Sequence, residues 1–349
     1  MRITARQAIN WFPLIQRIAV WSLVLALLLY ALWPMLPWGR SRTRMLVLYG
    51  FSILGEVMNE GVFPAFQAEW QRRHGERVEF ISSFASSGTI TNQLILGVPA
   101  QVAILSLELD ALRLVDRGVL SGPTWRALPH RGVVNRTPFI IMVRPGNPRR
   151  VQDFADLAKS GVGVVHPDPL TSGGAQWAIL AEYGAALRGT GDRNAARREL
   201  LGIWHNVVAQ ASSARAARTQ FENGFGDALI TYEQEALRDR ARGRLKADVV
   251  YPRSTILSEH TVVIVEKNIR AADRELVRNF VDFLWSARAQ RIFVEYGFRS
   301  VDDRRNAEDH GFGTIADPFL VSDLGGWLRA RAEIIDAVWM RTVLPEVGR

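Results

Sequence analysis

An α/β fold, in which helices cover mostly parallel β-sheets, is predicted by three features of this 349-residue sequence. Short apolar runs typical of strands alternate with amphipathic stretches of helical spacing from residue 45 onward. No internal repeat of roughly 20–50 residues and no low-complexity tract interrupts this alternation. The hydrophobic share of 48% is ordinary for a folded chain, and the length allows one large core or two smaller ones.

The strands are predicted from runs of mostly apolar residues that end at turn-forming residues. They span residues 45–49, 78–81, 102–105, 138–143, 162–165, 227–232 and 261–265. The helices are predicted from apolar residues spaced along one face, as for Val57, Phe63, Phe66 and Trp70 in the first. They span residues 56–73, 89–96, 107–117, 151–158, 176–184, 273–286 and 287–296.

The N-terminal segment 18–39 carries no charged residue, and Arg2, Arg6 and Arg17 precede it. About 20 apolar residues suffice to cross a bilayer as a helix, whereas the apolar core of a signal peptide has only about 7–15. We therefore expect residues 1–40 to form a transmembrane signal anchor, with a cleaved signal peptide as the alternative. The body of the protein then lies on the periplasmic side of the cytoplasmic membrane.

The net charge of +8 comes from arginines that are spread along the whole chain. We attribute it to a general preference for arginine and expect no nucleic-acid partner, since no nucleic-acid motif accompanies it. The absence of cysteine excludes disulfides, thiolate metal sites and a cysteine nucleophile. The six histidines never lie three or four residues apart, so the sequence indicates neither a metal site nor a cofactor.

The loop 167–175 is the strongest candidate for a binding site. Ser172 stands where the N-cap of the following helix belongs, and Gly173 and Gly174 open its first turn without side chains. Free backbone N–H groups and the positive end of the helix dipole would then face outward. Because the loop has no lysine or arginine, it would hold an anion by dipoles and hydrogen bonds. We expect the nearby Asp168 to stabilise its own turn.

Several strings, in order and spacing, make the sequence resemble the sulfate- and thiosulfate-binding proteins of bacterial ABC importers. The strings are residues 86–88, 105–110, 116–120, 143–148, 167–175, 213–215, 226–230 and 325–327. The resemblance covers about residues 45–330. It implies a two-lobed type II periplasmic-binding-protein fold with a central cleft, with residues 45–139 plus 262–349 as lobe 1 and 140–261 as lobe 2. It also implies an ABC permease as partner, and we expect a monomer.

The resemblance further implies that the cleft holds a dehydrated sulfate ion by neutral hydrogen-bond donors. Ser172, Gly173 and Gly174 match the family's serine and glycines, and Ser87 and Ala214 match its backbone donors. Two positions depart from the family pattern. Tyr232 stands where the family has a tryptophan, and Ser52 matches only approximately a position that is usually aspartate.

The residues themselves agree with this expectation, because Ser87, Ser172 and Ala214 each lie just before a helical pattern. Three helix N-termini aimed at one point suit a fully deprotonated dianion. A phosphate site would instead need an acceptor for the phosphate proton. As an alternative, the protein is a membrane-tethered binding module for another tetrahedral oxyanion, phosphate or molybdate. In that case it serves a sensor or another partner.

An enzyme is not expected. The sequence contains neither a Gly-x-Ser-x-Gly elbow nor a phosphate-binding P-loop, and Ser87 and Ser172 have no base beside them.

Overall fold

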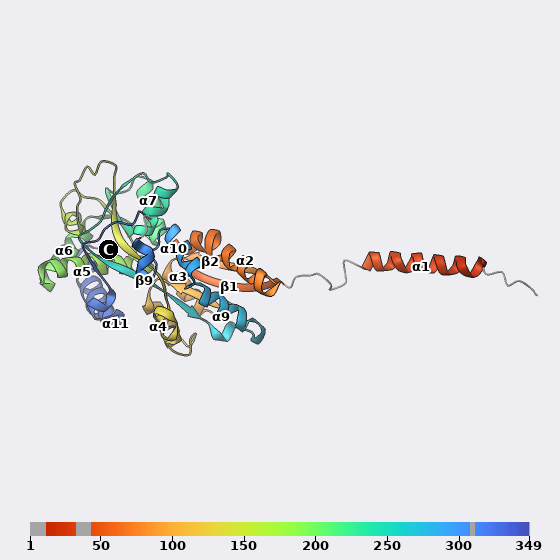
Figure 1. Ribbon diagram of the computed structural model, residues 1–349. Helices are drawn as coiled ribbons and strands as arrows, with labels where there is room; N and C mark the ends of the chain where they lie inside the picture. Colours follow the sequence, from red (N-terminus) through yellow and green to blue (C-terminus); the bar gives the residue numbers. More distant parts are fainter. Residues whose placement is uncertain (1–11, 33–42, 308–310, 349) are drawn as a thin grey trace, which may run out of the picture. The chain divides into compact units, whose positions relative to one another are not determined.

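The computed structural model describes residues 12–32, 43–307 and 311–348 (Figure 1). The chain divides into two units, Met1–Arg42 and Thr43–Arg349. The first contains helix α1 (Phe12–Leu32).

The predicted membrane anchor is not supported by helix α1. The predicted apolar segment runs to residue 39, whereas α1 ends at Leu32, begins before the segment and includes Gln16 and Arg17. Residues 33–42 lie outside the described residues. Within the described ranges, no helix is both long enough and apolar enough to span a bilayer.

The second unit is built on a sheet in which two long strands join two sets of strands. The order of the strands across this sheet is β2-β1-β3-β9-β4-β7-β5-β6, with β10 beside β9 and β8 beside β4. The strands are β1 (Thr43–Phe51), β2 (Arg77–Ala85), β3 (Val102–Leu105), β4 (Val133–Val143), β5 (Val164–Pro167), β6 (Val207–Ala211), β7 (Ala228–Tyr232), β8 (Asp248–Val250), β9 (Ser254–Ile264) and β10 (Asp317–Phe319). Parallel pairs form at both ends, as predicted. In the middle, β9 runs antiparallel to β3 and β4, and β4 runs antiparallel to β7 and β8, whereas β10 pairs with β9 in parallel.

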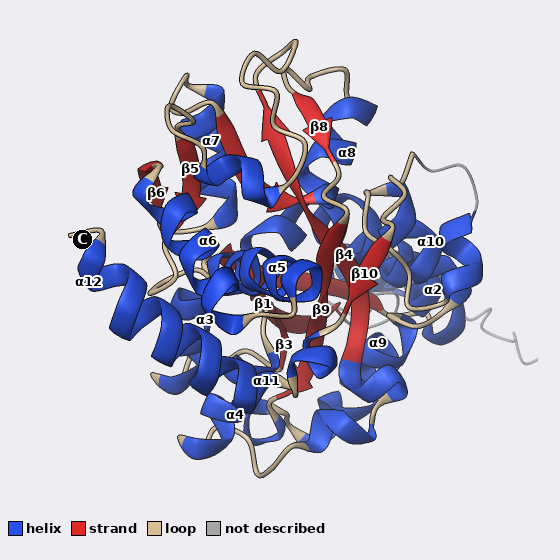
Figure 2. Ribbon diagram, turned by 90° about the vertical axis from the view of Figure 1, so that its left-hand side faces the viewer, coloured by secondary structure: helices blue, strands red, loops and turns tan. Residues whose placement is uncertain are grey.

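Helices surround these strands (Figure 2). They are α2 (Phe63–His74), α3 (Ser87–Ile95), α4 (Glu108–Asp116), α5 (Gly173–Thr190), α6 (Arg193–His205), α7 (Ala214–Glu222), α8 (Glu233–Ala241), α9 (Arg274–Phe283), α10 (Ala287–Glu295), α11 (Trp327–Ala330) and α12 (Leu344–Glu346). Helix α3 contacts β1, α7 contacts β5, β6 and β7, and α5 packs on β9 and α6. Helices from both sets of strands thus reach the middle of the unit.

Strand β4 belongs to both sets of strands. It pairs with β9 as far as Pro138, and from Phe139 onward it pairs with β7. Each set also has its own apolar cluster: one includes Ile90 and Trp125, the other Phe221, and a larger cluster joins the two. This is the two-lobed α/β architecture expected from the sequence. The lobe boundaries at 139/140 and 261/262 stay a prediction.

Two of the predicted helices differ in kind from the observed elements. The predicted helix 56–73 is a π-helical segment η3 (Val57–Val62) followed by α2, because Pro64 has no N–H to donate at the start of α2. The predicted helix 151–158 is only a 3₁₀ turn, η6 (Phe154–Ala158). The Asp156 carboxylate accepts from the N–H groups of Gln152 (2.6 Å) and Asp153 (3.1 Å), which holds this stretch as a turn.

Candidate functional site

The loop before α5 has the local structure that its residues predict. The Asp168 carboxylate accepts a hydrogen bond from Leu170 N at 2.9 Å, and the Asp168 carbonyl accepts one from Ser172 N at 2.8 Å. Asp168 therefore stabilises its own turn, as expected. Ser172 is the N-cap of α5, and its Oγ accepts from Ala175 N at 3.3 Å. The N–H groups of Gly173 and Gly174 remain at the open end of the helix.

Helices α3 and α7 begin in the same way. Ser86 and Ser213 are their N-caps, and each accepts a hydrogen bond from a backbone N–H three residues later, at 3.3 Å and 3.1 Å. Ser87 and Ala214, the first residues of the two helices, are buried. Serine caps thus fix three helix starts. Ser172 is the cap that the sequence predicted, whereas Ser86 and Ser213 each lie one residue before the expected positions Ser87 and Ala214.

The three helix tips come together. A Cβ atom placed on Gly173 would lie 3.0 Å from the Cβ of Ser87 and 2.9 Å from Ser106 Oγ. A Cβ atom placed on Gly174 would lie 3.2 Å from the Cβ of Ala214. Only a residue without a side chain allows the start of α5 to approach α3 and α7 this closely.

Tyr232 completes this cluster from the end of β7. A Cβ atom on Gly174 would lie 2.9 Å from Tyr232 Oη, and this hydroxyl shares a hydrogen bond of 3.2 Å with Ser106 Oγ. The tyrosine ring packs on Phe139, with ring centroids 4.5 Å apart. Burial raises the pKa of the Tyr232 phenol well above its usual value, so the hydroxyl stays protonated and can donate to an anion.

Ser52 lies near the cluster through its neighbours. It begins the 3₁₀ turn η2 (Ser52–Leu54) directly after β1, and this turn contacts α7. The ring of the preceding residue, Phe51, lies 6.4 Å from that of Tyr232. The predicted site residues Ser87, Ser172, Gly173, Gly174, Ala214 and Tyr232 are thus brought together, and Ser52 follows a strand that ends beside them.

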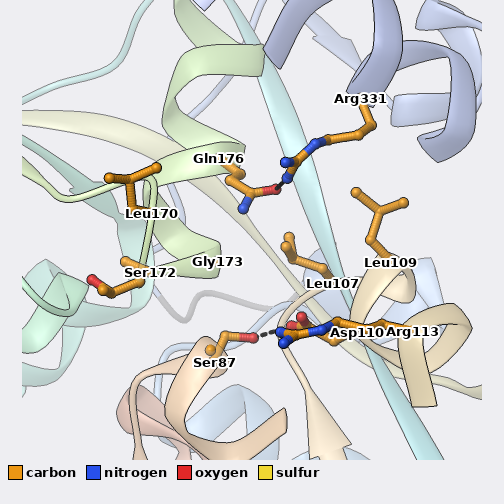
Figure 3. A pocket seen from close by; sticks show the side chains of 12 residues that line it. Ser87, Leu107, Leu109, Asp110, Arg113, Leu170, Ser172, Gly173, Gln176 and Arg331 are labelled. Carbon is orange, nitrogen blue, oxygen red and sulfur yellow. Dashed lines mark hydrogen bonds between the residues drawn. The ribbon is translucent and has the colours of Figure 1, made fainter. Parts of the chain in front are cut away.

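A pocket of about 310 Å³ opens on one side of these helix tips (Figure 3). It is lined by Ser87, Gly88, Leu107, Leu109, Asp110, Arg113, Leu170, Thr171, Ser172, Gly173, Gln176 and Arg331. Ser87 Oγ donates a hydrogen bond to the buried carboxyl of Asp110. Burial raises the pKa of Asp110, although the hydrogen bond from Ser87 acts in the opposite direction.

Metal binding has no support in this geometry. Within the part of the chain that the structure describes, no three His, Cys, Asp or Glu residues gather as metal ligands.

Comparison with known proteins decides the family. The sequence model of a family described as "Bacterial extracellular solute-binding protein" matches residues 56–299. The chain belongs to this family. The sulfate-binding protein of Synechococcus elongatus is 32% identical over 83% of this chain and 83% of its own length. The thiosulfate-binding protein of Pseudomonas aeruginosa is 34% identical over 66% and 70%. The predicted resemblance is thereby confirmed.

Solved structures agree with the fold. The sulfate-binding protein SubI from Mycobacterium tuberculosis superposes with a TM-score of 0.76 and 29% identity, covering 83% of this chain and 99% of that one. A periplasmic thiamin-binding protein superposes with a TM-score of 0.61 over 86% and 96% of the two chains, but at 16% identity it shows the shared fold alone.

Behind the helix tips, this solute-binding protein has a cluster of ion pairs between α7, α8 and the segment after β1. Arg215 pairs with Glu56 and Glu235, both at 3.1 Å, and Arg238 pairs with Glu56 at 2.6 Å. Burial raises the pKa of Glu56, but the charges of Arg238 and Arg215 outweigh this effect, so its pKa lies below the usual value. Arg215 therefore acts behind the site by holding the start of α7 to the segment after β1.

Three residues at the site were missed by the sequence reasoning. Ser106 lies at the end of an apolar strand, Asp110 in an ordinary amphipathic helix, and Arg331 lies 155 residues after Gln176 of α5. These three residues belong to the site only through contacts with residues that are distant in the sequence. Trp177 is buried, and its indole N–H donates to the carbonyl of Ser106 at 2.8 Å.

Proposed function

We propose that this solute-binding protein captures sulfate, or thiosulfate, on the periplasmic side of the cytoplasmic membrane and delivers it to an ABC permease. The convergence of the α3, α5 and α7 tips on Gly173 and Gly174 supports this most directly. Neutral N–H and O–H donors fixed in a water-poor site compensate a dianion without a buried cation. Two relatives of the chain, a sulfate-binding protein and a thiosulfate-binding protein, point to the same ligands.

The same donors favour a deprotonated anion over a protonated one. Phosphate, the second candidate, brings a proton that needs an acceptor, and Asp110 is a carboxyl at the edge of the same pocket. Burial raises the pKa of Asp110, which disfavours its charged form. A carboxyl whose charged form is disfavoured repels sulfate less and accepts the phosphate proton less readily than an ordinary carboxylate, so we expect sulfate to bind more tightly.

Capture would involve closure of the lobes about β4 and β9. Residues 45–139 plus 262–349 would move against residues 140–261, because both long strands cross between the two sets of strands. The closed form would then be the one that the permease engages. We also propose that the protein acts as a monomer without enzymatic activity.

Calorimetric titration of the full chain with sulfate, thiosulfate, phosphate and molybdate tests this function. We expect sulfate or thiosulfate to bind most tightly. A substitution Gly174→Val should abolish binding, because its side chain would enter the space beside Tyr232 Oη and Ala214 Cβ. The matched control is Gly189→Val, near the other end of α5, where a Cβ meets nothing within 4 Å.

The outcomes separate the candidates. Phosphate binding without any heat from sulfate would replace sulfate by phosphate as the ligand. Unchanged affinity in Gly174→Val, with the fold confirmed by circular dichroism, would place the site elsewhere. A mass of two chains by light scattering would contradict the monomer.

A further inference from the structure

The pocket beside the helix tips is larger than an inorganic oxyanion requires. Its volume of about 310 Å³ lies at the lower end of pockets that bury small organic ligands, roughly 300–1,000 Å³. One water molecule takes about 30 Å³ in the liquid, so a sulfate ion of five heavy atoms leaves about half of this space unfilled. The size of the pocket therefore suits a ligand with a substituent.

The pocket is continuous with the donors at the helix tips. Ser87, Ser172 and Gly173 belong to the converging helix starts and also line the pocket. Its two walls come from α3 and α4 on one side and from the loop before α5 on the other (Figure 3). One ligand can consequently place an oxyanion group at the donors and a second group in the pocket.

The far side of the pocket combines apolar and cationic side chains. Leu107 and Leu109 offer apolar surface there, and Leu170 does so from the opposite wall beside Ser172 (Figure 3). Arg113 donates to the neutral amide oxygen of Asn92 at 2.8 Å, and its charge also acts on the carboxyl of Asp110. Arg331 is held by Asp336 at 2.6 Å and reaches Gln176 Oε1 at 3.3 Å.

We infer that this pocket binds the substituent of a short-chain organic sulfonate that carries a carboxylate. The inference rests on the proposed function, since the sulfonate group would use the donors at Ser172 and Gly173. A sulfonate is deprotonated at neutral pH and presents tetrahedral oxygens, as sulfate does. The carbon chain would lie along the leucines, and the carboxylate would face the guanidinium of Arg113, with Arg331 beside it.

Asp110 is compatible with this ligand although it is itself a carboxyl. It accepts a hydrogen bond from Ser87 and is turned toward that residue at the end of the pocket nearest α3 (Figure 3). Burial raises its pKa, which disfavours its charged form. Among the residues that line the pocket, two guanidinium groups, those of Arg113 and Arg331, stand against this single carboxyl.

The inference is tested with sulfoacetate, sulfate and methanesulfonate, titrated calorimetrically into the full-length protein. We expect sulfoacetate to bind within about tenfold of the affinity for sulfate and to compete with it. Methanesulfonate, which has no carboxylate, should bind at least about tenfold more weakly than sulfoacetate. Sulfate binding with no sulfoacetate binding overturns the inference and leaves the proposed function standing. Sulfoacetate binding without sulfate binding overturns the proposed function, and no binding of either ligand overturns both.

The substitution Arg113→Gln locates the carboxylate. It should weaken sulfoacetate about tenfold or more and sulfate by no more than about threefold, because only sulfoacetate loses a charge-assisted hydrogen bond. Arg117→Gln, at the exposed end of α4, is the matched control and should change neither affinity. An equal loss of affinity for both ligands in Arg113→Gln would mean that the arginine attracts any anion by its charge and does not bind the carboxylate. This result would overturn the inference. Thermal unfolding of each variant confirms that it is folded.

Discussion

The backbone N–H of Gly88 donates a hydrogen bond to the carbonyl oxygen of Thr171 at 3.1 Å. This bond joins the first turn of α3 to the loop that precedes α5, so it links two segments that the sequence assigns to different lobes. The approach is so close that a Cβ atom on Gly88 would lie 2.9 Å from the same oxygen. Gly88 does not have a positive φ, so any residue could adopt its backbone conformation. Glycine is needed here because a side chain would prevent the close approach.

Gly88→Ala should weaken sulfate binding about tenfold. The added methyl would push α3 away from the loop, and overpacking of this kind costs roughly 1–3 kcal/mol in the closed form. Calorimetric titration measures the loss, with Gly122→Ala as the control, because a Cβ there meets nothing within 4 Å. An alanine variant that binds sulfate like the original protein would show that this close approach does not contribute to closure.

Glu56→Gln should destabilise the protein by roughly 2 kcal/mol, because it leaves the buried Arg238 without one of its carboxylate partners. Urea unfolding measures the difference. Glu69→Gln, which breaks a pair with Arg73 inside one helix, should cost less than about 1 kcal/mol. Equal costs for the two variants would contradict a special role for Glu56.

The contribution of the Glu56–Arg238 ion pair to stability should depend on pH. The pKa of Glu56 is lowered in the folded protein, so its contribution is complete above the usual value of 4.5 and is lost as the pH falls through the lowered value. The difference in stability between the original protein and Glu56→Gln should therefore shrink on acidification and stay constant at higher pH.

The local features of the site could be predicted from sequence, and its assembly could not be predicted from the residues alone. The N-cap at Ser172 and the turn at Asp168 depend on contacts within four residues, and both are observed as predicted. The contact between Gly173 and Ser87 joins residues far apart in the chain, and only the family resemblance anticipated it. Arg331 had no such signal, because its place beside Gln176 depends on how the C-terminal helices pack.

The fold shows the same limit. The strand predicted at 162–165 is β5 (Val164–Pro167), two residues later. Gly163 N donates to the Asp227 carboxylate at 2.8 Å, so residues before Val164 follow a loop that a distant side chain fixes. Helix α6 was not predicted, although Asp192 caps it and apolar residues follow at helical spacing. This local signal was present in the sequence and was missed.

Tyr232→Phe should weaken sulfate binding about five- to tenfold. It removes one hydroxyl donor, worth roughly 1 kcal/mol or somewhat more toward a charged acceptor, and keeps the ring that packs on Phe139. Calorimetry measures the affinity, and Tyr183→Phe, at a tyrosine within α5, is the control. Unchanged sulfate affinity in Tyr232→Phe would remove the phenol from the donor set.

The affinity of the original protein for sulfate should be flat from about pH 6 to pH 9. Burial raises the pKa of the Tyr232 phenol above its usual value of 10.0, so the donor keeps its proton throughout this range. Titrations across the range, at constant ionic strength, measure the dependence. A loss of affinity toward pH 9 would indicate that a donor deprotonates.

His260 should make the protein less stable in mild acid. It is fully buried, its Nδ1 lies 2.6 Å from Asn135 Oδ1, and burial lowers its pKa to about 3 from 6.5. Between these two values the unfolded chain binds one more proton than the folded protein, so stability rises with pH and falls on acidification. This residue alone should cost about 2 kcal/mol between pH 7 and pH 5, measured by urea unfolding. His260→Gln should remove that part of the slope, whereas the substitution of the exposed His205 by glutamine should keep it. An identical slope in His260→Gln would show that the imidazole is not held neutral in the folded state.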